Sequence, residues 1–171
     1  YNANGSNNET KTSTASVNDG NWNHVAVSKS GTSLKFFING ALDSTHVLSY
    51  VNTNSGSAIY IGADTNSSPS RYYVGHIDDL RISTIARYTA TFTPPAAAFT
   101  NDGYTALLIH ADNSKNVGGT TLIDSSTGGL VSGLGKTALE FNDANDWLHV
   151  ADSDDWHLGT NEWCIEYWLR T

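Results

Sequence analysis

Residues 20–42 have the sequence GNWNHVAVSKSGTSLKFFINGAL, in which two β-branched and aromatic runs are separated by short turn signals. Ser30–Thr32 has a central glycine and predicts a tight hairpin turn between the runs. Asn39-Gly40, after the second run, is among the strongest short hairpin signals. We therefore expect strands at Trp22–Lys29 and Ser33–Asn39, within an antiparallel three-stranded meander that ends near Leu48.

The rest of the chain repeats this pattern of short apolar runs and turns. Helical periodicity is absent, and turn residues recur roughly every ten positions. Short strands without intervening helices predict an all-β sandwich or barrel. Irregular loops are expected at Gly62–Arg71 and Ala111–Thr121, and the prolines of Thr93–Ala98 should interrupt strand pairing. The further predicted strands are Ser57–Ile61, Tyr72–Ser83, Thr105–His110, Thr137–Asn142, Trp147–Ala151 and Trp163–Arg170.

Charge and composition exclude several classes of partner. The 171 residues carry a net charge of −8, with only 9 lysines and arginines. We therefore expect no nucleic-acid partner and no anionic membrane surface, since both need clustered positive charge. No apolar run is long enough to cross a bilayer, so membrane insertion is not expected. The one cysteine, Cys164, excludes an internal disulfide and a thiolate zinc site. The length fits one domain, and the lack of methionine indicates either a mature product or, as we favour, a segment of a longer reading frame.

Four motifs follow one another in a recognisable order. They are WNHVA at residues 22–26, FING at 37–40, YIG at 60–62 and GHIDDLRI at 75–82. This order resembles the laminin-G-like, concanavalin A-like lectin/glucanase sandwich family. The continuation through residues 86–110 is similar to repeats of that family in phage and marine-virus structural proteins. The resemblance implies an all-β fold, an antiparallel β-sandwich of the concanavalin A-like jelly-roll type.

The C-terminal third resembles the opening of the same family, out of order. Residues 1–104 match the C-terminal part of the family domain, and residues 105–171 match its N-terminal part. Two explanations stay open: a circular permutant that folds as a single sandwich over residues 1–171, or a cut from a tandem array. In both we expect Thr105–Thr171 to share a core with Trp22–Ala86. The strands that usually join the two parts are mostly missing, and the resulting unpaired sheet edge offers a route to self-association.

Catalytic residues are the first functional candidates, because glucanases share this sandwich. Those enzymes carry an E-x-D-x-x-E strand that places an acid and a nucleophile on one face. The nearest counterpart, Glu162 to Glu166, lacks the aspartate and has a different spacing. The resemblance places Glu166 where the family has a non-catalytic, hydrogen-bonded glutamate, so we do not expect an enzyme. No histidines have metal-ligand spacing, and His24 matches a structural histidine of the family.

Calcium (Ca²⁺) is the predicted metal, since hard cations prefer carboxylate and carbonyl oxygens. One acidic cluster is Asp78-Asp79, and the other contains Asp143 and Asp146. The resemblance implies that Asp78 can bind calcium together with backbone carbonyls of neighbouring loops.

The alternative for the first cluster is structural. Asp78 would then accept hydrogen bonds from loop amides, and Asp79 would pair with Arg81 or Arg87. A third acidic loop, residues 152–155, has no EF-hand spacing and is expected to be solvated.

Aromatic side chains beside polar loops are typical of glycan recognition, in which rings stack on the C–H faces of sugars. Trp22, Trp163 and Trp168 are expected in the core instead. The favoured function is a non-catalytic carbohydrate-recognition or adhesion module of a virion or secreted surface protein. Its partner would be a glycan or cell-surface polysaccharide, and its location extracellular or on the virion surface. A structural spacer without ligand and a glycoside hydrolase are the alternatives. The expected carbohydrate-binding residues are Trp156, Tyr72, Trp147 and Asp154.

Overall fold

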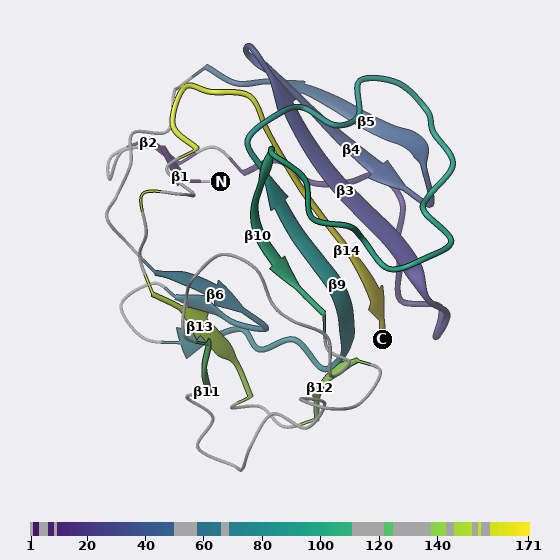
Figure 1. Ribbon diagram of the computed structural model, residues 1–171, viewed down its shortest axis with the longest axis vertical. Coiled ribbons are helices and arrows are strands. Elements are labelled where there is room, and N and C mark those ends of the chain that lie inside the picture. Colours follow the sequence, from purple (N-terminus) through teal and green to yellow (C-terminus); the bar gives the residue numbers. More distant parts are fainter. Residues whose placement is uncertain are drawn as a thin grey trace.

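The computed structural model describes residues 10–49, 58–65, 69–110, 122–124, 138–142, 146–151, 154 and 158–171, and the two short strands before residue 10. The described part contains strands and no α-helix, as expected for an all-β protein (Figure 1). No described helix could therefore span a membrane. The strands are β1 (Asn2–Ala3), β2 (Asn7–Asn8), β3 (Asn23–Ser30), β4 (Ser33–Ile38), β5 (Ala41–Val47), β6 (Ile59–Ile61), β7 (Asp64–Thr65), β8 (Pro69–Ser70), β9 (Gly75–Ser83), β10 (Thr105–Ile109), β11 (Leu122–Asp124), β12 (Leu139–Phe141), β13 (Leu148–Val150) and β14 (Trp163–Arg170).

The larger sheet has the strand order β10-β9-β14-β3-β4-β5, with β12 paired to β9. Its β3-β4-β5 segment is the predicted antiparallel meander. The turns that join these strands use Gly31 at a φ of 56°, and Asn39 and Gly40 at 50° and 79°. Left-handed backbone of this kind suits glycine and asparagine, which explains why these turns could be located from the sequence.

The C-terminal strand β14 lies at the centre of the larger sheet. It pairs antiparallel with β3 on one side and with β9 on the other, so Ile165 faces both Val27 and Ile82 in register. The expected packing of the C-terminal third against the earlier strands therefore occurs within one chain. The order of the family motifs, as permutant or tandem cut, stays a prediction.

The main core lies between the larger sheet and a three-stranded sheet of order β11-β13-β6, visible at the lower left of Figure 1. Strand alternation decides which side chains enter it. Ile165 and Tyr167 of β14 pack against this core, whereas Cys164 and Glu166 point to the opposite face of the larger sheet. The buried members of the main core, between the two sheets, are Ile61, Ile77, Leu80, Ile82, Ala106, Leu107, Ile109, Leu139, Phe141, Leu148 and Val150.

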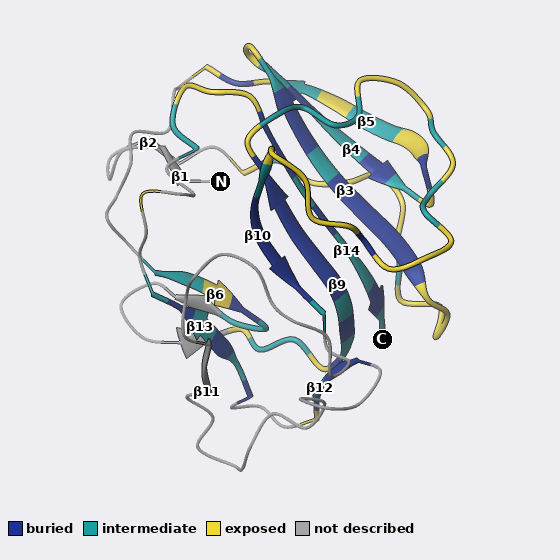
Figure 2. Ribbon diagram, viewed as in Figure 1, coloured by how far each residue is buried: buried dark blue, intermediate teal, exposed yellow. Residues whose placement is uncertain are grey.

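The opposite face of the larger sheet is covered by the β9–β10 connection, residues 84–104, which crosses the sheet without forming strands (Figure 2). Its Tyr88 and Phe92 rings stack at 3.5 Å and pack on a small cluster of Ala26, Phe37 and Cys164. Both faces of β14 are therefore buried, which agrees with its nearly continuous apolar sequence.

Two expectations about local structure are wrong. Trp22 is 37% exposed, because it precedes the first residue of β3 and lies beyond the region that the connection covers. Gly62–Arg71 is not wholly irregular, since β7 and β8 pair there antiparallel. Trp163 is buried as predicted, and Trp168 is half-buried. The expected loop at 111–121 lies outside the described residues.

Candidate functional site

A β-bulge in β9 determines where the two aspartates of the IDD motif point. Glu166 pairs with Arg81 and Trp168 with Asp78, so two β9 residues face the single residue between them on β14. The first of the two, Asp79, has a φ of 48°. Regular alternation would turn one of the two adjacent aspartates toward the apolar core, but the extra residue keeps both on the outer face.

These aspartates line an open hollow of about 350 Å³ on the outer face of the larger sheet. Trp22 and Trp168 supply its aromatic walls, and Pro95–Ala98 of the β9–β10 connection close another side. The guanidinium of Arg170 lies 5.2 Å from the centre of the Trp22 ring. The Trp168 ring meets His24 edge-on at 5.2 Å, so one indole is anchored inside the sheet and the other faces solvent.

Each aspartate of the hollow has an identified hydrogen-bond donor. Asp78 Oδ1 accepts from the Asp79 amide at 2.8 Å, a donor within β9 and not one of the loop amides that the structural alternative named. Asp79 contacts His110 Nδ1 through Oδ1, and its Oδ2 accepts from the Phe99 amide at 3.2 Å. Pairing of Asp79 with Arg81 or Arg87 is therefore wrong, because both guanidinium groups turn toward Glu166 instead.

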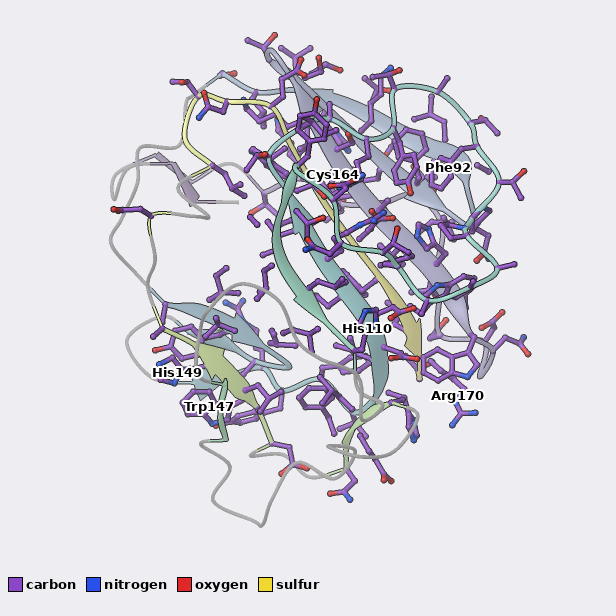
Figure 3. The ribbon with its side chains drawn as sticks, in the orientation of Figure 1. Phe92, His110, Trp147, His149, Cys164 and Arg170 are labelled. Carbon is purple, nitrogen blue, oxygen red and sulfur yellow. The ribbon has the colours of Figure 1, made fainter. Side chains whose placement is uncertain are left out.

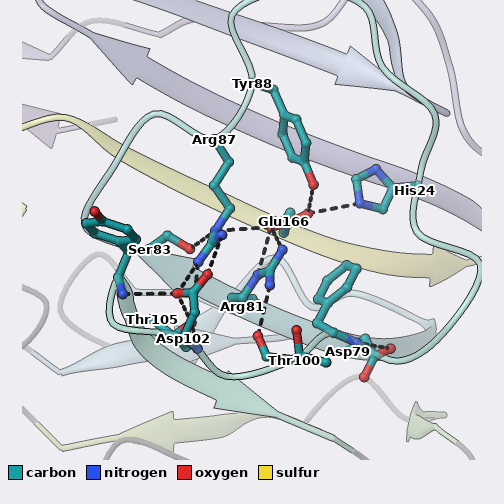
Figure 4. Close-up of polar contacts among 12 residues, drawn as sticks. His24, Asp79, Arg81, Ser83, Arg87, Tyr88, Thr100, Asp102, Thr105 and Glu166 are labelled. Atoms are coloured by element: carbon teal, nitrogen blue, oxygen red, sulfur yellow. Dashed lines mark hydrogen bonds and ion pairs between the residues drawn. The ribbon is translucent and has the colours of Figure 1, made fainter.

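Glu166 is the centre of a fully buried polar network beneath the connection (Figure 4). Arg81 donates to its Oε1 through Nε at 2.9 Å and Nη2 at 2.6 Å. Tyr88 donates its hydroxyl to Oε2 at 2.7 Å, and His24 Nε2 lies 3.2 Å from the same oxygen. Burial alone would raise the pKa of Glu166, but the His24, Arg81 and Tyr88 contacts outweigh it and lower that pKa.

This network holds the β9–β10 connection against the sheet and so positions the wall of the hollow. Arg81 also donates to the Thr100 carbonyl at 3.1 Å, and its guanidinium lies 4.6 Å from the Phe99 ring centre. Arg87 forms a two-pronged ion pair with Asp102 at 2.8 and 2.9 Å, which lowers the pKa of that carboxyl. Residues 95–98 lie between the Tyr88 and Phe99 anchors, and are therefore held in place from both sides.

A second group of aromatic rings lies on the three-stranded sheet (Figure 3). Leu148 of β13 belongs to the core, so its neighbours Trp147 and His149 point outward. Tyr60 of β6 pairs with His149 across the strands, with ring centres 5.7 Å apart, and lies 5.3 Å from Trp147. Trp147, a predicted sugar-binding residue, thus has two aromatic neighbours that the sequence did not single out.

Two of the other predicted sugar-binding residues lie in the described part of the chain. Tyr72 is half-buried before β9, and Asp154 is exposed. Trp156 and Asp143 lie outside the described residues. Asp146 is 3% exposed and accepts from the Asn142 amide at 3.0 Å.

The sequence predicts calcium binding by Asp78, Asp143 and Asp146. Among the described residues, no three His, Cys, Asp or Glu side chains gather where they could hold a metal ion. Asp78 and Asp146 each use an oxygen for a backbone amide. The described side chains therefore do not form a calcium site by themselves, and one at Asp78 would need carbonyl oxygens as well.

Trp22 and Trp168 are the site residues that the sequence missed. Both were assigned to the core because a tryptophan is buried by default. The signal that could have indicated the exposure of Trp22 is its position just before the first residue of β3. Nothing in the local pattern marks Trp168, whose exposed part depends on where the distant connection stops.

The strand pairing and the core between the two sheets define an antiparallel β-sandwich. Residues 1–91 match the family described as the concanavalin A-like lectin/glucanases superfamily, and the chain belongs to it. The resemblance drawn from the WNHVA, YIG and IDDLRI motifs is thereby confirmed. Comparison with curated proteins and with solved structures gave no match.

Proposed function

We propose that the chain is a non-catalytic carbohydrate-recognition module and that the hollow is its binding site. The supporting observation is the combination of Trp22 and Trp168 with Asp78 and Asp79 around one open hollow. Indole faces pack on the C–H faces of sugar rings, and carboxylates accept hydrogen bonds from sugar hydroxyls. Membership of a superfamily of lectins and glucanases agrees with this chemistry.

A hydrolytic function is the weaker alternative. Glu166, the residue nearest to the glucanase pattern, is fully buried and has donors on both carboxylate oxygens. It therefore cannot reach a sugar in the hollow. The proposal extends to location, since a polysaccharide ligand would place the module outside a cell or on a virion surface. Calcium at Asp78 is a separate proposal, because a bound calcium ion and a cationic group of a ligand would compete for the same carboxylate.

A glycan array with two matched variants tests the proposal. Trp22→Ala removes the exposed indole of the hollow, and we expect it to abolish binding of the glycans that the wild type retains. Tyr104→Ala, the control, removes an aromatic ring that is 55% exposed and does not line the hollow. If the wild type binds no glycan on the array, a structural spacer is favoured. Loss of binding in both variants, or in neither, would exclude the hollow as the binding site.

A further inference from the structure

The charge of the hollow narrows the kind of glycan that it would accept. Its described lining contains two aspartates and no lysine, arginine or histidine, and the basic groups next to that lining are His110, which contacts Asp79 Oδ1, and Arg170, which lies against the Trp22 ring. Asp79 is 7% exposed and Asp78 is half-buried, so both carboxylates are partly removed from water. Electrostatic attraction is stronger in such surroundings than in bulk solvent, so a cationic ligand group gains more here than a neutral one.

The aromatic walls favour the same ligand charge. The face of an indole ring is its negative side and attracts cations. The Arg170 guanidinium, 5.2 Å from the Trp22 ring centre, already makes this kind of contact with Trp22, so a ligand cation would depend on the other indole. Trp168 offers a second indole next to the aspartates. The hollow thus places an indole that can attract a ligand cation next to two carboxylates.

The bulge in β9 makes this combination possible. A regular strand would place Asp78 and Asp79 on opposite faces of the sheet, and only one carboxylate would reach the hollow. The left-handed conformation of Asp79, at a φ of 48°, instead brings both to the outer face. Doubling the negative charge is unnecessary for binding neutral hydroxyls, but it suits an ammonium group, which has three N–H donors and no acceptor.

From this geometry we infer that the hollow selects amino sugars with a free ammonium group over sugars in which that position is neutral. The inference rests on the proposed glycan-binding function and specifies its ligand class. The ammonium group would lie between Asp78 and Asp79, and the apolar faces of the sugar would pack on Trp22 and Trp168. The net charge of −8 would also steer a polycationic glycan toward the molecule.

The test uses three oligosaccharides with the same linkage and length, which differ only in one substituent on each ring. That substituent is an ammonium, an acetamido or a hydroxyl group. Binding is measured by titration calorimetry at low salt and at a pH below the pKa of the sugar amine. We expect the ammonium form to bind at least about tenfold more tightly than either neutral form, an advantage that falls as salt screens the charges.

Asp78→Asn keeps the size of the side chain and removes its charge, so it should reduce the preference for the ammonium form. Glu162→Gln, the control, removes the same charge from an exposed residue that accepts from the Ser30 hydroxyl outside the described lining, and it should leave the preference unchanged. An equal loss in both variants would overturn the assignment to the hollow.

The three titrations of the wild-type protein distinguish failure of the ammonium preference from failure of the glycan-binding function, without any variant. Equal binding of all three oligosaccharides would overturn the ammonium preference while the glycan-binding function stands. Tighter binding of a neutral form would do the same. Binding of none of the three here, together with an empty glycan array, would overturn both.

Discussion

Glu166→Gln should unfold the protein at markedly lower denaturant concentration, because it removes the charge at the centre of a buried network. In the wild type, Oε1 accepts from Arg81 and Oε2 accepts from Tyr88. Glutamine keeps one acceptor oxygen and replaces the other by a donor. At least one of these two buried partners then loses its acceptor, and the Arg81 charge loses its counter-charge.

The size of the effect follows from the burial. The Glu166 side chain is 0% exposed and that of Arg81 is 8% exposed, so water cannot replace the lost contacts. Removing one partner of a buried ion pair costs about 3–5 kcal/mol. With a urea slope of ~2 kcal/mol per M, the lower figure shifts the midpoint by about 1.5 M. Tryptophan fluorescence in a urea titration measures this shift.

Glu162→Gln is the matched control for this prediction. Glu162 is an exposed glutamate that accepts from the Ser30 hydroxyl at 2.6 Å, and its replacement should change the stability by less than about 0.5 kcal/mol. Similar midpoints for both variants would refute the view that the network holds the connection in place.

The pH dependence of stability gives an independent measure of the same charge. The pKa of Glu166 is lower in the folded protein than in the unfolded chain, where it is about 4.3. The stability that its charge contributes is therefore present above about pH 4.3 and is lost as the pH falls through the lower folded value. Other carboxyls, such as Asp102, contribute to acid unfolding in both proteins. The difference between wild type and Glu166→Gln should consequently shrink as the pH falls below ~4.

Three further outcomes are expected. Gly40→Ala should lower the free energy of unfolding by about 2 kcal/mol or more, because a Cβ there would lie 2.0 Å from the Phe92 carbonyl oxygen at a φ of +79°. Gly31→Ala, at a φ of +56° with no atom within 4 Å of the added Cβ, should lower it less. Equal urea midpoints for the two variants would contradict this. The Cys164 thiol should resist disulfide reagents at neutral pH until urea unfolds the chain. Burial, as the larger cause, and the Glu166 charge raise the pKa of Cys164 to about 12. Rapid labelling of the folded protein would be inconsistent with that burial. If Asp78 binds calcium, the ion at 100 times its dissociation constant should stabilise the fold by ~2.7 kcal/mol and raise the melting temperature. Asp78→Asn should abolish this response. An unchanged melting curve would leave Asp78 as an acceptor for the Asp79 amide.

The sequence by itself determined the local structure of this protein. The glycine-containing turns at Gly31 and Gly40 located the meander, and the apolar run at residues 163–170 located β14, whose alternation divides it into two faces. These features depend on backbone preferences and on strand periodicity, which act over a few residues. The ordered motifs then identified the superfamily.

The tertiary structure alone decided what those two faces meet. Glu166 and His24 are 142 residues apart in the chain, and Asp79 and His110 are 31 apart, so no local pattern predicts their contacts. The exposure of Trp22 likewise depends on where the β9–β10 connection crosses the sheet, and the direction of Asp79 depends on one extra residue opposite β14. Burial and pairing at these positions follow from packing between distant segments, and strand alternation specifies which side a residue faces but not what covers that side.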